Sequence, residues 1–310
     1  MDAGAFVPIA VTDRSGFDES VHHGAVVALG PNGAVVWSAG DPDVVVYPRS
    51  ALKPLQAAAM VQLGLVVPDA QLALVCASHD GCPEHVALVR ELLATGGLTE
   101  HHLANTATLP LNTGAAEDLV RLGVGPSPIL HNCSGKHAGM VVTATTNGWT
   151  VEGYCSPDHP LQAAILDHLG AVAGPLVHVG VDGCGAPAAA LALSALARAV
   201  RQLAVSAHST HRAMTAHPHL VGGPDRDVTR LMRAVPGLMA KDGAEGVYVA
   251  ALPDGRAVAL KVADGASRAR LPVMLGALAR LGVDVPLDSL RQPILGHGRD
   301  VGQVRALVGP

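Results

Sequence analysis

A serine and a lysine stand three residues apart in YPRSALKPLQ, residues 47–56. Lysine is scarce in this chain: of 21 basic residues only Lys53, Lys136, Lys241 and Lys261 are lysines, and the other 17 are arginines. Arginine keeps its proton near neutral pH, whereas a buried or crowded lysine can lose it. The composition therefore makes each retained lysine a candidate for amine chemistry.

Ser50 and Lys53 fall at the predicted start of a helix, where residues i and i+3 share a face. A neutral amine at Lys53 can take the proton of the Ser50 hydroxyl, which gives the serine–lysine form of nucleophilic catalysis. The helix dipole would stabilise an oxyanion beside this pair. The alternative is that Ser50 only caps the helix.

Ser78, in the segment CASHDGCPEH, follows an apolar run that we interpret as a buried strand. Polar residues at strand ends often carry chemistry, but from sequence alone a serine that caps the next helix is the better interpretation. Lys261 falls in a predicted strand, where alternation can point its side chain inward or into solvent. Spacing by itself does not choose between these alternatives.

The segment HNCSGKHAGM, residues 131–140, brings Cys133 and Lys136 to i, i+3 spacing, and Cys184 follows in DGCGAP. Two cysteines are too few for a closed four-cysteine zinc site, so other ligands would have to complete it. Buried thiols without a metal explain the same residues equally well.

Several elements must position these groups. Strands are predicted over residues 8–47 and a β-hairpin over 246–262, around Pro253-Asp254-Gly255. A buried strand is predicted in PLVHVGVDGCGAP. Helical periodicity covers SALKPLQAAAMVQLG and residues 84–95, 161–172, 187–203 and 269–281.

This order predicts an α/β fold in which an antiparallel sheet is flanked by helices and holds an inserted helix-rich region. We expect one enzyme unit over residues 1–310. Residues of about 1–50 and 240–310 would contribute the main sheet, and about 51–239 would form the helix-rich middle with the metal and substrate motifs.

Composition excludes several classes of function. A net charge of -5 and 2% aromatic residues argue against nucleic-acid binding. The N-terminal segment has no basic and apolar regions of a signal peptide, and the apolar stretches are too broken to cross a bilayer. We therefore expect a cytoplasmic protein whose five cysteines are thiols or metal ligands.

Taken in order, YPRSALKPLQ, ASHDG, HNCSGKHAGM, YCSPDHPLQ, VDGCGAP, KDGAEG and ALKVADG resemble the bacterial L-asparaginase II family of the Rhizobium type, also called class 3 asparaginases. The resemblance runs from about residue 8 to 275. It implies a serine-β-lactamase-like fold, a homodimer, and hydrolysis of L-asparagine through a serine acyl-enzyme.

The resemblance also implies roles for individual residues. Two serine–lysine pairs would be catalytic, namely Ser50 with Lys53 and Ser78 with Lys261. One zinc ion per chain, which orients the pocket rather than activating water, would be held by Cys133, Lys136 and Cys184. The substrate pocket would be lined by Arg49, His137 and Asp182, because an arginine suits an α-carboxylate and an aspartate suits an α-ammonium.

One motif departs from the family pattern. Where the family usually reads S-H-S-G-E, this chain has Ser78-His79-Asp80-Gly81-Cys82, which adds a carboxylate and a thiol beside Ser78. Alternatives to an asparaginase are a glutaminase or β-lactamase-like serine hydrolase, and a catalytically inactive protein that binds an amino acid or zinc.

Overall fold

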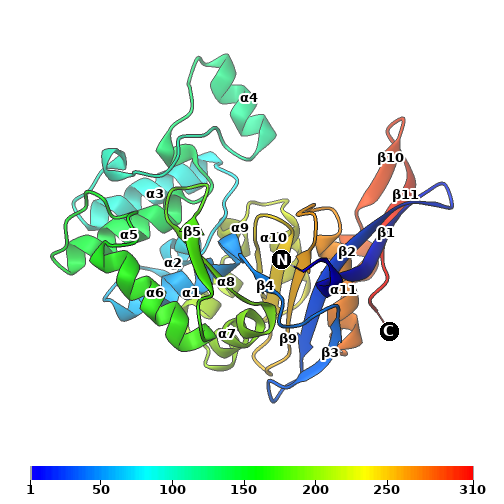
Figure 1. Cartoon of the computed structure of the whole chain (residues 1–310). Coiled ribbons are helices and arrows are strands. Elements are labelled where there is room, and N and C mark those ends of the chain that lie inside the picture. The colour runs from blue at the N-terminus through cyan, green and yellow to red at the C-terminus, as the bar shows by residue number, and fades with distance from the viewer. Residues whose placement is uncertain (1, 310) are drawn as a thin grey trace. The chain divides into compact units, whose positions relative to one another are not determined.

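The computed structural model describes residues 2–309 and contains both helices and strands (Figure 1). The chain divides into two compact units. The first unit contains the segment up to Leu52, Ala190–Ala207 and everything from Arg230 onward. The second unit contains Lys53–Ala189 and His208–Thr229. None of the helices in the described part of the chain combines the length and the hydropathy needed to span a membrane.

An antiparallel sheet forms the first unit. Its strands follow the order β10-β11-β1-β2-β9-β8-β7, and β3 also pairs with β2. The strands are β1 (Val7–Arg14), β2 (Phe17–Leu29), β3 (Val35–Ala39), β7 (Met239–Asp242), β8 (Val247–Ala251), β9 (Ala257–Val262), β10 (Pro293–Gly296) and β11 (Arg299–Ala306).

Strands β8 and β9 of this sheet are buried on both faces. Every residue of β8 and of β9 is buried, and helices α7 (Leu193–Val205) and α11 (Arg270–Arg280) pack against both strands. The β8–β9 hairpin turns at Gly255, whose φ of 93° favours glycine. The predicted hairpin and the antiparallel α/β class are thus confirmed.

The smaller elements of the first unit lie around this sheet. They are η1 (Ala3–Ala5), β4 (Val45–Val46), the 3₁₀ helix η2 (Arg49–Leu52) and α12 (Leu287–Leu290). Strand β6 (Pro187–Ala192) and helix α10 (Asp227–Ala234) each begin in the second unit and end in the first.

Helices make up most of the second unit. They are α1 (Lys53–Gln62), α2 (Asp69–Val75), α3 (Pro83–Thr95), α4 (Thr113–Arg121), α5 (Ser134–Thr146), α6 (Pro160–Ala173), α8 (Ser209–Ala216) and α9 (Pro218–Val221). Shorter elements are η3 (Glu100–His102), η4 (Pro128–Leu130) and strand β5 (His178–Val181).

Helix α5 lies at the centre of the second unit, and its residues from Ser134 to Ala144 are all buried. It approaches α2 closely at two glycines. A Cβ on Gly135 would lie 2.4 Å from the Leu74 carbonyl oxygen, and one on Gly139 would lie 2.9 Å from the Val75 side chain. The sequence HNCSGKHAGM is therefore constrained by packing as well as by chemistry.

Three local predictions were wrong. Residues 187–192 form β6 rather than the start of a helix, because Leu191 and Ala192 pair with β4, and tertiary pairing outweighs the helix propensity of alanine. The run LALVCA before Ser78 is mostly helix α2, not a strand. Strand β5 exists, but three of its four residues are exposed.

Candidate active site

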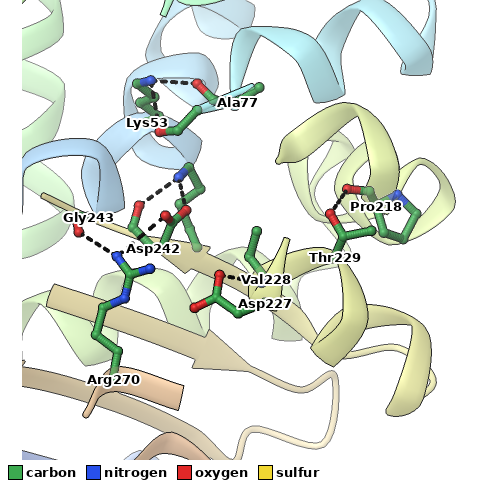
Figure 2. Close-up of polar contacts among 11 residues, drawn as sticks. Lys53, Ala77, Pro218, Asp227, Val228, Thr229, Asp242, Gly243 and Arg270 are labelled. Carbon is green, nitrogen blue, oxygen red and sulfur yellow. Dashed lines mark hydrogen bonds and ion pairs between the residues drawn. The ribbon is translucent and has the colours of Figure 1, made fainter. Parts of the chain in front are cut away.

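Lys53 and Ser78 meet within the second unit. The Lys53 amine donates a hydrogen bond to the Ser78 hydroxyl at 3.1 Å and another to the Ala77 carbonyl at 2.5 Å. Figure 2 shows the Lys53 side chain pointing at this carbonyl. Both residues are buried, with 2% of Lys53 and 6% of Ser78 exposed. The chain thus holds a lysine amine against a serine hydroxyl out of bulk water.

Backbone contacts fix the position of Ser78. Helix α2 ends just before it, where the Ala77 amide donates to the Leu74 carbonyl at 3.0 Å. The Ser78 amide donates to the Val221 carbonyl at 2.9 Å, which ties this turn to α9. The apolar helix therefore delivers Ser78 to the first residue of α1, a proximity that spacing in the sequence could not reveal.

The charge state of Lys53 follows from its surroundings. Burial lowers the pKa of this amine below its ordinary value, and the nearby Lys136 acts in the same direction. The sulfurs of Cys133 and Cys184 and the carboxylate of Asp182 oppose this lowering of the pKa. Since burial is the largest cause, the neutral amine needed in a base is favoured.

Ser50 and Arg49 lie in the first unit, in the 3₁₀ helix η2 that immediately precedes Lys53. Arg49 has a φ of 53°, which is the left-handed region that non-glycine residues rarely adopt. Backbone strain of this kind clusters at functional sites, and the substrate-binding role of Arg49 stays a prediction. The pairing of Ser50 with Lys53 stays a prediction.

Lys261 lies on β9 in the first unit, and 5% of it is exposed. Its amine donates to the Val262 carbonyl and, at 3.3 Å, to the Ala263 carbonyl. Burial lowers the pKa of Lys261, although Glu245 and Asp264 oppose the change. Alternation therefore turns this lysine away from open solvent, and its pairing with Ser78 stays a prediction.

The two sulfurs predicted as metal ligands come together in the second unit. Ligand atoms of Cys133, Cys184 and His137 lie within 4.8 Å of one another, and all three residues are buried. The Lys136 amine lies 3.4 Å from the Cys184 sulfur. The structure therefore brings together the predicted ligands Cys133, Lys136 and Cys184, and it adds the His137 ring, for which the family resemblance implied a substrate contact.

The polar contacts of His137 fit a metal ligand. Its Nδ1 lies 2.8 Å from the Tyr154 hydroxyl, whereas its Nε2 is buried with no hydrogen-bond partner among the described residues. A buried nitrogen without a partner needs an explanation, and an ion beside two sulfurs is one. Hydrogen bonding through the other ring nitrogen is also the usual pattern of a ligating histidine.

Charges within this cluster favour the ligating form of Cys133 but the protonated, non-ligating form of Lys136. Although burial raises the pKa of Cys133, the Cys184 hydrogen bond and the Lys53 and Lys136 charges bring that pKa down to about 6. Burial would lower the pKa of Lys136, but the two sulfurs outweigh it and raise that pKa. The site thus favours a thiolate, which is the form of cysteine that binds metals.

Asp182 begins the turn that presents Cys184. Its side-chain oxygen accepts from the Gly183 amide at 2.7 Å, and its own amide donates to the Ala186 carbonyl at 2.8 Å. The half-buried Asp182 carboxylate is therefore held by the same Gly-rich turn that places a sulfur beside Lys136.

Lys241 is the one lysine for which neither the motifs nor the family resemblance implied a role. It is fully buried in the first unit and its amine donates to an Asp242 side-chain oxygen at 2.6 Å. Arg270 lies 3.5 Å from the other oxygen of Asp242 and donates to the Gly243 carbonyl at 3.1 Å (Figure 2). Only the rarity of lysine hinted at this buried ion-pair network.

The chain is similar to one protein family and to several solved structures. A family model described as L-asparaginase II matches residues 10–306. Two solved structures are similar at low identity. A β-lactamase from Mycobacterium bovis has 16% identity and a TM-score of 0.39, over 83% of this chain and 94% of that one. A putative β-lactamase from Bacteroides dorei has 15% identity and a TM-score of 0.47, over 83% and 92%. No curated protein sequence matches the chain.

Proposed function

The chain belongs to the L-asparaginase II family, and on this basis we propose that it hydrolyses L-asparagine to L-aspartate and ammonia. The match of the family model to nearly the whole chain carries this proposal. The buried Lys53–Ser78 contact supports it, because a lysine can act as base toward a serine only as the neutral amine, which burial favours.

In the proposed mechanism the Ser50 oxygen attacks the side-chain amide carbon of asparagine while Lys53 takes the hydroxyl proton. The carbon–nitrogen bond then breaks, and the proton leaves with ammonia. Water attacks the resulting ester, which releases aspartate and restores the serine. Ser78 and Lys261 would relay protons, and the hydrogen bond between Lys53 and Ser78 supports such a relay.

We further propose that Arg49 binds the α-carboxylate and Asp182 the α-ammonium of the substrate, with His137 beside them. Cys133, Lys136 and Cys184 would hold one zinc ion per chain, and the unpartnered His137 nitrogen lies close enough to join them. A bound zinc would orient the pocket by fixing these side chains.

An ammonia-release assay with asparagine, with glutamine and without substrate tests the proposed function, and a chromogenic cephalosporin adds a β-lactamase substrate. We expect ammonia from asparagine. Release from glutamine alone would identify a glutaminase, and cleavage of the cephalosporin alone would identify a β-lactamase-like hydrolase. Binding of asparagine without any turnover would identify an inactive binding protein.

The Ser50→Ala and Ser78→Ala variants test the choice of nucleophile. We expect Ser50→Ala to lose activity and to form no acyl-enzyme, detected as a mass increase in rapidly quenched protein. Ser78→Ala should slow turnover but still form the acyl-enzyme. The reverse pattern would make Ser78 the nucleophile and Lys53 its direct base.

A further inference from the structure

A second cluster of potential ligands lies beside Ser78, at the departure from the family motif. Asp80, Cys82 and His85 follow one another in DGCPEH, and their ligand atoms lie within 4.8 Å of one another. His85 Nδ1 lies 2.9 Å from the Cys82 sulfur and 3.1 Å from an Asp80 oxygen. A carboxylate, a thiol and an imidazole thus converge on one point.

Local structure explains why these three side chains meet. Gly81 turns the chain with a φ of 79°, and Pro83 then begins helix α3. Cys82 is the N-cap and His85 lies in the first helical turn, so the two are three residues apart on the same face. Asp80, on the other side of the turn, reaches back to the same nitrogen.

The far side of the His85 ring is held as in metal sites. Its Nε2 lies 3.2 Å from the His219 carbonyl oxygen, which can only accept, so Nε2 carries the proton. In the neutral ring Nδ1 is then a lone pair aimed at the sulfur and the carboxylate. A ligating histidine commonly donates its other N–H to a backbone carbonyl in this way.

A glycine makes room for the Asp80 carboxylate. Gly223 has a φ of 142°, and a Cβ at this position would lie 2.0 Å from an Asp80 oxygen. The Asp80 carbonyl also accepts from the Asn112 amide at 2.8 Å. The carboxylate is therefore seated by the backbone around it, with 4% of Asp80 exposed.

We propose that Asp80, Cys82 and His85 form a further zinc-binding site, distinct from the Cys133–Cys184 cluster. His85 Nδ1 and the Asp80 oxygen lie at hydrogen-bond distance, so a proton joins them when no metal is bound, and zinc would take the place of that proton. Zinc takes nitrogen, sulfur and carboxylate oxygen together, whereas calcium and magnesium prefer oxygen alone.

The site also has a route for the ion and an open position. Asp80 and Cys82 line a cavity of about 860 Å³ in the second unit. A tetrahedral zinc with bonds of about 2.3 Å to sulfur and about 2.0 Å to nitrogen separates these atoms by roughly 3.5 Å. The Cys82 sulfur therefore has to withdraw slightly, toward the cavity side, and a water or an anionic ligand from the cavity completes the coordination.

The test measures bound zinc in the full-length protein after metal removal, zinc refilling and desalting. Each of Cys82→Ser, His85→Gln and Asp80→Asn should hold about one zinc fewer per chain than the unmodified protein. Asp118→Asn is the matched control, because this carboxylate lines the same cavity outside the cluster, and its zinc content should not change. Equal zinc in the unmodified protein and the three cluster variants overturns the proposal.

A Cys133→Ser/Cys184→Ser background separates the two clusters. Added Co²⁺ should still produce a thiolate-to-metal absorption band there, and adding Cys82→Ser should abolish it. A band that is absent from this folded background, or that persists without Cys82, contradicts the proposal. Gly223→Ala should weaken zinc binding about 10–100-fold in a chelator competition, because its Cβ displaces the carboxylate that supports the site. These outcomes do not depend on asparaginase activity.

Discussion

Lys53 is a buried amine whose two hydrogen bonds end on a carbonyl and on the Ser78 hydroxyl. Burial is the largest influence on the pKa of this amine and lowers it. The rarity of lysine in the sequence has a physical reason at this position, because a guanidinium stays protonated and could not take the proton of a serine.

The first prediction concerns pH. Burial lowers the pKa of Lys53, and a base is active only above its pKa, so kcat/KM should rise about tenfold per pH unit up to a plateau that begins below the ordinary lysine pKa of about 10.4. Lys53→Arg should lose at least ~100-fold in kcat/KM at every pH. A pH–rate profile decides it, and near-normal turnover by Lys53→Arg would refute the amine-base mechanism.

The second prediction concerns the buried Lys241–Asp242 pair. Asp242→Ala leaves an ammonium without its buried counter-charge and should lower the free energy of unfolding by roughly 3–5 kcal/mol. Asp18→Asn is the control in the same unit, because its pair with Arg305 is about half exposed and should contribute less than about 1 kcal/mol. Urea unfolding measures both, and equal losses would contradict a special role for burial.

Helix α5 shows how an element can position a site through its small residues. Cys133, Lys136 and His137 stand at its N-terminal end, and the helix is fixed there by close approach to α2 at Gly135. The side chains of Cys133, Lys136 and His137 are thus placed by a glycine that has no functional group of its own.

The third prediction uses two glycines on different helices. Gly135→Ala should destabilise the protein by roughly 1–3 kcal/mol and lower its zinc content, because its Cβ would meet the Leu74 carbonyl. Gly170→Ala, on α6, has open space around its Cβ and should stabilise by about 0.5–1 kcal/mol. Thermal unfolding compares the two, and a stabilising Gly135→Ala would show that α2 and α5 can separate without cost.

Sequence predicted the elements whose local signals agree with their tertiary setting. The β8–β9 hairpin has a Pro-Asp-Gly turn between β-rich runs, and α3 and α6 have clear periodicity, so each lies within a residue or two of its predicted range. In the alanine-rich residues 187–192 the local helix propensity disagrees with the tertiary structure. Pairing with β4 made them a strand, and no local pattern carries that information.

Those parts of the candidate site were predictable whose residue types are rare in this chain and chemically reactive. Scarce lysines and two cysteines in Gly-rich turns drew attention to Lys53, Cys133 and Cys184. Their three-dimensional partners were not predictable, since Ser78 reaches Lys53 only through the end of α2, and His85 joins Asp80 only through the start of α3. Such contacts depend on where a helix begins or ends, and the spacing of residues in the sequence does not reveal these positions.

The fourth prediction concerns assembly of the whole protein. The family resemblance leads us to propose a homodimer, so light scattering should give twice the chain mass of 31.5 kDa. The mass should stay constant on dilution to the concentrations used for activity. A species of single-chain mass that retains full activity would contradict a dimer requirement.

The pairing of β1 with β11, in which Ala10 lies opposite Ala306, has a consequence for synthesis of the chain. Residues Gly24–Leu29 of strand β2 likewise pair with β9, which is synthesised much later. A ribosome adds about 5–20 residues per second, so on the order of tens of seconds pass between the emergence of Leu29 and that of Ala257. During that interval the nascent β-hairpin exposes an apolar edge that can pair wrongly, whereas the helices of the second unit emerge together. We therefore expect the sheet to be completed only after β11 has left the ribosome, and this stage to be the one at which a chaperone changes the yield.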